Sequence, residues 1–170
     1  TDIIFHPGFY LDSTKEEAFE SINEELGKLP VLENNFYRLE TTGKETQFGN
    51  LKELCELVKN HKHVKLCVDF SHIHARYVGI LKQYDDFAKI FDYIGENLGE
   101  EALKDIHVHL SGIEYTAKGE KNHLPFEESD FNIKDCLKAF LNYDVKGCII
   151  CESPILEKDA LLMKNIYESL

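Results

Sequence analysis

The sequence lacks several features that would assign the chain to a particular class. No apolar run reaches the ~18 residues that a membrane-spanning helix needs, so we expect no membrane segment. The amino end lacks the charged and then apolar pattern of a secretory signal. The chain begins with Thr1 rather than methionine, and we expect Thr1 to mark a processed or fragment boundary. The glycine-rich phosphate loop that follows the first strand of an open nucleotide-binding sheet is also absent.

Positive charge is scarce. The chain has 19 lysines and arginines against 31 aspartates and glutamates, which gives a formal net charge of −12. This balance argues against a general surface for polyanions such as nucleic acids. It leaves room for a local anion site, because bound metal ions can neutralise several carboxylates.

The five cysteines are an odd number and do not suggest a disulfide framework. Cys148 and Cys151 form a CxxC motif, but residues three apart in a strand point to opposite faces. We therefore expect neither a metal clip nor a redox pair there. Buried, reduced thiols are typical of cytosolic proteins, so we expect a cytoplasmic location.

Strand-like apolar runs alternate with amphipathic helical patterns five times along the chain. The first helix is expected to begin at a capping box formed by Ser13 and Glu16. Strict alternation predicts parallel strands with helices packed outside them, in a single α/β domain over residues 1–170. A long polar loop is expected at residues 111–129.

Each strand-like run ends on a residue that can bind a metal ion. These residues are His6, Glu40, Asp69, His109 and Glu152. Functional residues of a (β/α)8 barrel come from the carboxyl ends of several strands, so the pattern favours a barrel over an open sheet. A complete barrel needs eight strands and this chain supplies five, which predicts an incomplete barrel. The outer strands, at residues 3–5 and 148–151, would leave unpaired edges that a missing segment or another chain is expected to cover.

Two further histidines, His72 and His123, lie in the segments that follow strands. The combined set of imidazoles and carboxylates suits zinc, manganese or iron better than calcium. Each residue alone has an ordinary structural explanation, such as a helix cap for an aspartate after a strand. Their recurrence at equivalent positions favours a shared metal site.

The remaining histidines have no such placement. His61, His63 and His74 are expected on the surface. His107 lies two residues before His109 and shares its face, either as a partner of that ligand or packed beneath it.

The strand-end motifs resemble those of the endonuclease IV family. The matching stretches are HPG at His6, ExT and a loop to Gly49 after Glu40, DxxH at Asp69, HL at His109 and the terminal Glu152. That family comprises zinc-dependent apurinic/apyrimidinic endonucleases of the xylose-isomerase-like barrel superfamily. The resemblance covers nearly the whole chain. It implies the carboxyl-terminal five βα units of a (β/α)8 TIM barrel, without the first three.

The resemblance also implies a site for two to three zinc ions, with manganese possible. Its ligands would be His6, Glu40, Asp69, His72, His109, His123 and Glu152. The implied reaction is hydrolysis of DNA 5′ to an abasic sugar, as in base-excision repair, with Glu40 and Glu152 as catalytic carboxylates. Damaged DNA would be the partner.

This sequence departs from the family in three ways. A further zinc-binding histidine and the DNA-probing loops of the first three strands would precede Thr1. The family also has an aspartate two residues before the third-zinc histidine, where this chain has Lys121. Either Lys121 turns outward and Glu120 replaces the aspartate, or the third metal is labile and Lys121 contacts a substrate phosphate. Repulsion between an ammonium and a dication favours a labile third metal.

Two other functions are compatible with these residues. A sugar isomerase or epimerase of the same superfamily would hold one metal through Glu40, Asp69, His109 and Glu152. A degenerate barrel with a structural zinc is the non-enzymatic alternative. His6 and His123 are extra to the isomerase site, and they favour the nuclease.

Overall fold

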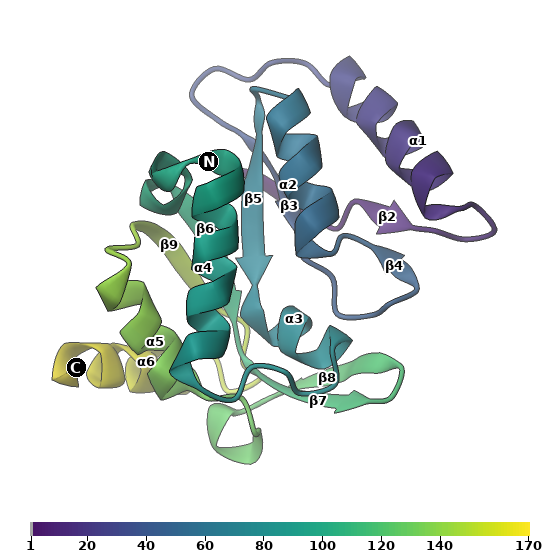
Figure 1. Cartoon of the computed structure of the whole chain (residues 1–170). Coiled ribbons are helices and arrows are strands. Elements are labelled where there is room, and N and C mark those ends of the chain that lie inside the picture. Colours follow the sequence, from purple (N-terminus) through teal and green to yellow (C-terminus); the bar gives the residue numbers. More distant parts are fainter. Residues whose placement is uncertain (1) are drawn as a thin grey trace.

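A curled parallel sheet of five strands forms the centre of the computed structural model, which describes residues 2–170 (Figure 1). The strand order is β1-β3-β5-β6-β9, and every neighbouring pair is parallel. The strands are β1 (Ile3–Phe5), β3 (Tyr37–Glu40), β5 (Val64–Asp69), β6 (Ile106–Leu110) and β9 (Gly147–Cys151). The half-barrel confirms the predicted α/β class and the partial (β/α)8 architecture.

Helices connect successive strands and pack on one side of the sheet. They are α1 (Lys15–Lys28), α2 (Leu51–Asn60), α3 (Phe70–Arg76), α4 (Tyr84–Leu98), α5 (Ile133–Asn142) and α6 (Glu157–Ser169), with short 3-10 turns η1 (Glu100–Lys104) and η2 (Phe126–Glu128). Aromatic side chains join α3, α4 and α5, since the Phe70 ring lies 5.5 Å from Phe91 and 5.6 Å from Phe140 between centroids. Such offset contacts add to the stabilisation from burial.

The cap of α1 differs from the predicted one by a single residue. Thr14, not Ser13, accepts the backbone N–H of Glu17, and Glu17 accepts the N–H of Thr14. The sequence around this point fits the capping box in two registers. Ser13 donates its own N–H to the carbonyl of Tyr10, so it belongs to the preceding turn.

Two small antiparallel sheets of two strands each stand at the carboxyl end of the main sheet. Strands β2 (Gly8–Phe9) and β4 (Gln47–Phe48) pair antiparallel, as do β7 (Gly112–Thr116) and β8 (Gly119–Leu124). The prediction of a long loop at residues 111–129 was therefore wrong. Gly119 makes the tight β7–β8 turn possible, because its φ is +92° and a Cβ would collide with the carbonyl of Gly43.

His74 is buried, so the prediction of a surface residue was wrong for it. Its side chain is 0% exposed, its Nδ1 accepts the N–H of Leu81 at 3.1 Å, and its Nε2 lies 3.0 Å from Asp130. The accepting Nδ1 leaves the proton on Nε2, which donates to the carboxylate. His61 and His63 are half-buried. His74 thus ties α3 to the segment that precedes α5.

We expect His74→Ala to lower the free energy of unfolding by about 2–3 kcal/mol, because it leaves a cavity and an unpartnered N–H of Leu81. Urea denaturation followed by circular dichroism would measure the change. His61→Ala is the matched control and should cost less than about 1 kcal/mol. Equal losses in the two variants would contradict this role of His74.

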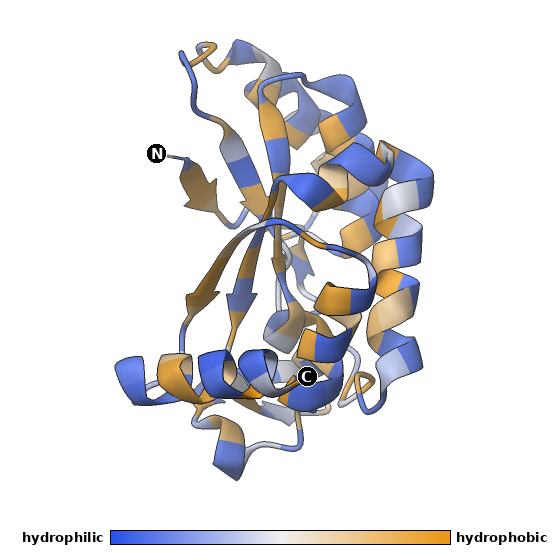
Figure 2. Cartoon of the chain, turned by 90° about the vertical axis from the view of Figure 1, so that its left-hand side faces the viewer, coloured by the Kyte–Doolittle hydropathy of each residue, from blue (hydrophilic) through white to orange (hydrophobic). Residues whose placement is uncertain are grey.

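Strands β1 and β9 form the two outer edges of the sheet, and both are largely apolar (Figure 2). Ile149 and Ile150 of β9 are exposed. Exposed apolar edges invite pairing with a further strand. Among residues 2–170, no helix is long and apolar enough to cross a membrane.

Candidate metal centre

The candidate site lies where the parallel strands end. Ligand atoms of Glu40, Asp69, His109 and Glu152 all lie within 4.8 Å of one another. Glu40, Asp69 and His109 occupy the ends of β3, β5 and β6, and Glu152 follows β9 directly. The carboxyl ends of parallel strands lie at one edge of the sheet. Glu40 and Glu152 therefore lie close together although they are 112 positions apart in the sequence.

Glu40 is the hub of the cluster. Its Oε1 lies 3.0 Å from Nδ1 of His109 and its Oε2 lies 3.5 Å from Nε2 of His6. Burial alone would raise the pKa of Glu40. The hydrogen bonds from His109 and His6 outweigh burial and lower it to about 2. Glu40 is therefore anionic throughout the physiological range.

Asp69 has one satisfied and one unsatisfied oxygen. Oδ1 accepts the N–H of His72 at 2.7 Å and so caps α3, whereas Oδ2 is buried without a hydrogen-bond partner. Burial, together with Glu40 and Glu152, raises the pKa of Asp69 despite the nearby His72. Nδ1 of His72 lies 3.5 Å from Oδ2 of Asp69, and a carboxylate oxygen that is 0% exposed and lacks a hydrogen bond favours a proton or a cation beside it. The donor set around it fits a metal ion.

His72 and His123 present free ring nitrogens to each other. Nδ1 of His72 lies 3.0 Å from the carbonyl of Thr41, and Nδ1 of His123 lies 3.0 Å from the carbonyl of Glu152. A carbonyl can only accept, so each Nδ1 carries a proton. The two Nε2 atoms then face each other at 3.4 Å. Two imidazole nitrogens on one tetrahedral zinc lie about 3.3 Å apart, so this pair also fits a metal ion.

His72 links this pair to the rest of the cluster. It belongs to a group with His6 and Glu40 and to another with Asp69 and His123, each with ligand atoms within 4.8 Å of one another. Burial would lower the pKa of His72, but the charges of Asp69, Glu120 and Glu40 raise it. The same negative field attracts cations. All seven residues selected from the sequence therefore lie in one connected cluster, and their role as ligands stays a prediction.

A β-bulge decides which side chain approaches His72 from strand β8. Tyr115 pairs with Glu120 and Glu114 pairs with Asn122, so Lys121 is the extra residue. An extra residue reverses the alternation of faces. Glu120 consequently turns toward the site, with Oε2 3.7 Å from Nε2 of His72. Lys121 turns outward and its Nζ lies 2.7 Å from Oε1 of Glu114.

The expectation of a third metal weakened by Lys121 was thus based on the wrong side chain. The bulge could not be predicted from the sequence, because it depends on how β8 pairs with β7.

We expect Glu120→Gln to weaken the binding of a metal ion by His72 and His123 by about 10–100-fold, since it removes an anionic partner. Lys121→Gln is the neighbouring control. Zinc titration by calorimetry would contradict this if Lys121→Gln had the larger effect.

Two residues that support the site were not selected from the sequence. Thr41 connects two strand ends, since its hydroxyl accepts the N–H of Asp69 at 2.9 Å. Arg76 is buried and donates to Thr42 Oγ1 at 2.8 Å and to the carbonyl of Gln47 at 3.0 Å. The loop after β3 is therefore held rigidly beside Glu40. The ExT motif marks Thr42, to which Arg76 donates, but it identifies neither Thr41 nor the partner arginine.

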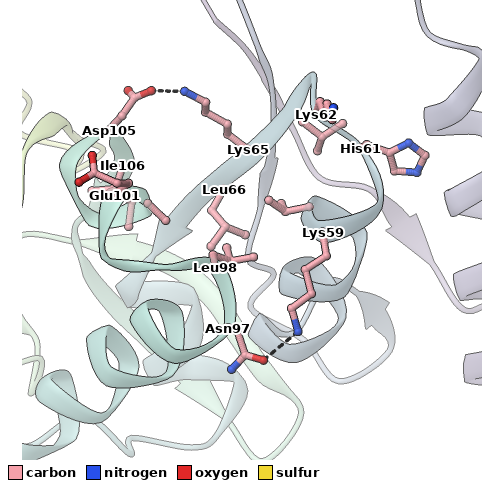
Figure 3. Close-up of a pocket in the computed structure, with 13 residues that line it drawn as sticks. Lys59, His61, Lys62, Lys65, Leu66, Asn97, Leu98, Glu101, Asp105 and Ile106 are labelled. Carbon is pink, nitrogen blue, oxygen red and sulfur yellow. Dashed lines mark hydrogen bonds and ion pairs between the residues drawn. The ribbon is translucent and has the colours of Figure 1, made fainter.

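A separate pocket of about 470 Å³ lies between α2, α4 and η1, at the amino ends of β5 and β6 (Figure 3). Two of its lysines contact neighbouring side chains: Lys59 lies 2.9 Å from Asn97, and Lys65 pairs with Asp105. The amino-terminal face of such barrels serves stability rather than catalysis. The chemistry-bearing residues lie at the opposite end.

Comparison with known proteins agrees with this architecture. Residues 1–166 match the xylose isomerase-like TIM barrel family. An uncharacterized protein of Methanocaldococcus jannaschii is 46% identical over 99% of this chain and 63% of its own length. A probable endonuclease 4 of Staphylococcus carnosus is 28% identical over 93% of this chain and 54% of its own length. One from Methanosphaera stadtmanae is 32% identical over 63% of this chain and 40% of its own length.

The chain spans roughly half to two thirds of the length of the relatives that match it over nearly its whole extent. The match to the family covers residues 1–166 of 170. The chain therefore belongs to the xylose isomerase-like TIM barrel family.

Proposed function

We propose that this chain carries the metal centre of a zinc-dependent phosphodiester hydrolase of the endonuclease IV type, which cleaves DNA 5′ to abasic sites in base-excision repair. One observation carries the proposal. The facing Nε2 atoms of His72 and His123 form a second donor pair beside the group of Glu40, Asp69, His109 and Glu152. A site with donors for more than one ion suits phosphodiester cleavage, which needs charge neutralised on both the attacking and the leaving oxygen. Similarity to probable endonuclease 4 proteins supports the same class.

The donors divide among two or three ions. Glu40, Asp69, His109 and Glu152 would hold one, His6 would hold another together with Glu40, and His72 and His123 would hold the third with Glu120 beside them. Bound zinc supplies positive charge for the phosphodiester and lowers the pKa of a coordinated water molecule.

The protein residues set the charge and the proton acceptor of this site. Four carboxylates, Glu40, Asp69, Glu120 and Glu152, would repel a phosphate group unless cations neutralise them. Glu40, with a pKa of about 2, remains ionised and gives a fixed negative charge. Glu152 is the accessible carboxylate, with a side chain 31% exposed and Oε1 3.2 Å from Nδ1 of His109. We assign its Oε2 as the acceptor of the proton that the attacking water loses.

The activity would belong to a barrel in which further strands pair with β1 and β9. The two apolar outer strands and the greater length of the relatives support this arrangement. An additional segment of the protein or another chain would supply those strands.

The direct test is cleavage of a DNA duplex that carries one tetrahydrofuran abasic analogue, with zinc or manganese added to the chain together with the strands that cover β1 and β9. We expect a single cut 5′ to the analogue and no cut in the matched undamaged duplex. Loss of activity on chelation and its return with zinc should accompany the cut. Metal-loaded protein that neither binds nor cuts the abasic duplex would contradict the proposal.

A sugar isomerase or epimerase is the second candidate. Glu40, Asp69, His109 and Glu152 alone complete a one-metal site of that type, and the net charge of −12 suits a neutral sugar better than DNA. Metal counting by elemental analysis discriminates the two. Two or three ions per chain favour the hydrolase, and a single ion with activity on a sugar panel favours the isomerase.

A further inference from the structure

A second layer of side chains lies below the strand-end cluster on the same face of the sheet. Cys67 and His107 occupy it, two residues before Asp69 and His109 on β5 and β6, so each shares a face with the residue above it. Cys67 is the register partner of His107, as Asp69 is of His109. None of the functions considered above uses Cys67 or His107.

This layer contains donors that are close together and incompletely satisfied. Ligand atoms of Cys67, His107 and His109 all lie within 4.8 Å of one another. Nε2 of His107 is buried and has no hydrogen-bond partner. Cys67 is 0% exposed and forms no disulfide. A buried imidazole nitrogen without a partner is costly, which indicates that something absent from the protein atoms completes it.

His109 can serve both layers. Its Nδ1 faces the upper group, at 3.0 Å from Glu40 and 3.2 Å from Glu152. Nε2 remains for the layer below, because the two nitrogens lie on different sides of the imidazole ring. The lower layer thus offers one thiol and two imidazoles, whereas the upper group offers three carboxylates and one imidazole.

We propose that Cys67, His107 and His109 form a separate binding site for one thiophilic metal ion of the zinc class, below the strand-end cluster. Sulfur and imidazole donors suit zinc, and three protein ligands leave a fourth position for water. Binding forms a metal–sulfur bond and releases the thiol proton of Cys67 to solvent. Where Nδ1 of His109 already serves the upper group, the proton on its Nε2 is released as well. The site shares His109 with the proposed nuclease centre, whereas its other two ligands, Cys67 and His107, lie outside that centre.

Cobalt(II) is a suitable probe, because a cobalt–thiolate bond gives an intense near-ultraviolet charge-transfer band that carboxylate and imidazole ligands do not give. Titrating the intact chain with cobalt(II) should produce this band, with an intensity at saturation that corresponds to one cobalt–thiolate bond per chain. Cys67→Ser and His107→Ala should each lose it. Cys148→Ser is the matched thiol control, because Cys148 is exposed and is the register partner of His107 on β9, and it should keep the band. Glu152→Gln, which alters the upper group and leaves Cys67 and His107 unchanged, should keep it too.

Circular dichroism of each variant guards against loss of the band through unfolding. If Cys67→Ser does not fold, His107→Ala decides the question. A wild-type chain without a thiolate band overturns the proposal, as does a band that survives in folded Cys67→Ser or His107→Ala. If Cys148→Ser lost the band instead, the thiolate ligand would be Cys148 and not Cys67, and this result would also overturn the proposal.

Discussion

Glu40→Gln is expected to remove most of the stabilisation that zinc gives this chain at the strand-end cluster. A metal that binds only the folded state at 100 times its Kd stabilises it by about 2.7 kcal/mol, or about 5–11 °C in Tm for a domain of this size. Loss of a residue that merely orients a ligand costs 10–100-fold in metal affinity. Loss of the charged hub should therefore cost at least about 100-fold, which leaves about 0.4 kcal/mol of stabilisation at the same zinc concentration.

Scanning calorimetry with and without zinc measures this effect. Glu114→Gln is the control, because Glu114 pairs with Lys121 on the hairpin and belongs to none of the candidate metal groups. Glu114→Gln should retain the full rise in Tm on addition of zinc. The same Glu40→Gln variant should lose most cleavage of abasic DNA. If zinc raised the Tm of Glu40→Gln as much as that of the natural chain, Glu40 would not be a principal ligand of the site.

Asp69→Asn should change stability in opposite directions with and without metal. The asparagine keeps the oxygen that accepts the N–H of His72, so the cap of α3 survives. It removes the buried charge on the unpartnered Oδ2. The metal-free variant should therefore be as stable as the natural chain or more stable by about 1–2 kcal/mol, whereas the zinc-loaded variant should be the less stable of the two.

The stability of the metal-free chain should fall as pH rises through the pKa of Asp69. The pKa of Asp69 is raised by burial, so its contribution is favourable below the unfolded value of 3.8 and is lost as pH rises through the folded pKa. The metal-free natural chain should lose this stability as pH rises, and Asp69→Asn should not. Asp159→Asn is the control, since Asp159 is buried and accepts the N–H of Phe126 away from the site. If zinc raised the stability of the natural chain and of Asp69→Asn by the same amount, Asp69 would not be a metal ligand.

The sequence predicts the architecture and the main cluster because both follow from local patterns. Apolar runs ending in His6, Glu40, Asp69, His109 and Glu152 mark strands and their carboxyl ends at once. In a parallel sheet those ends meet at one edge, so local pattern and topology together bring side chains from distant segments into contact.

The features that the sequence could not predict depend on pairings that the local pattern of residues does not specify. The residue that approaches His72 is Glu120 rather than Lys121 because β8 is bulged against β7. His74 is buried because Asp130, 56 residues away, accepts its hydrogen bond. Neither pairing can be predicted from the composition or the hydrophobic periodicity of the sequence.

We expect metal ions to bind at the carboxyl ends of the strands, through the carboxylates and imidazoles that converge there. Anomalous diffraction at the zinc absorption edge, from crystals of the intact chain grown with zinc, would locate them. We expect one peak enclosed by Glu40, Asp69, His109 and Glu152 and another between the Nε2 atoms of His72 and His123. A zinc-containing crystal with no anomalous peak at either position would contradict this expectation.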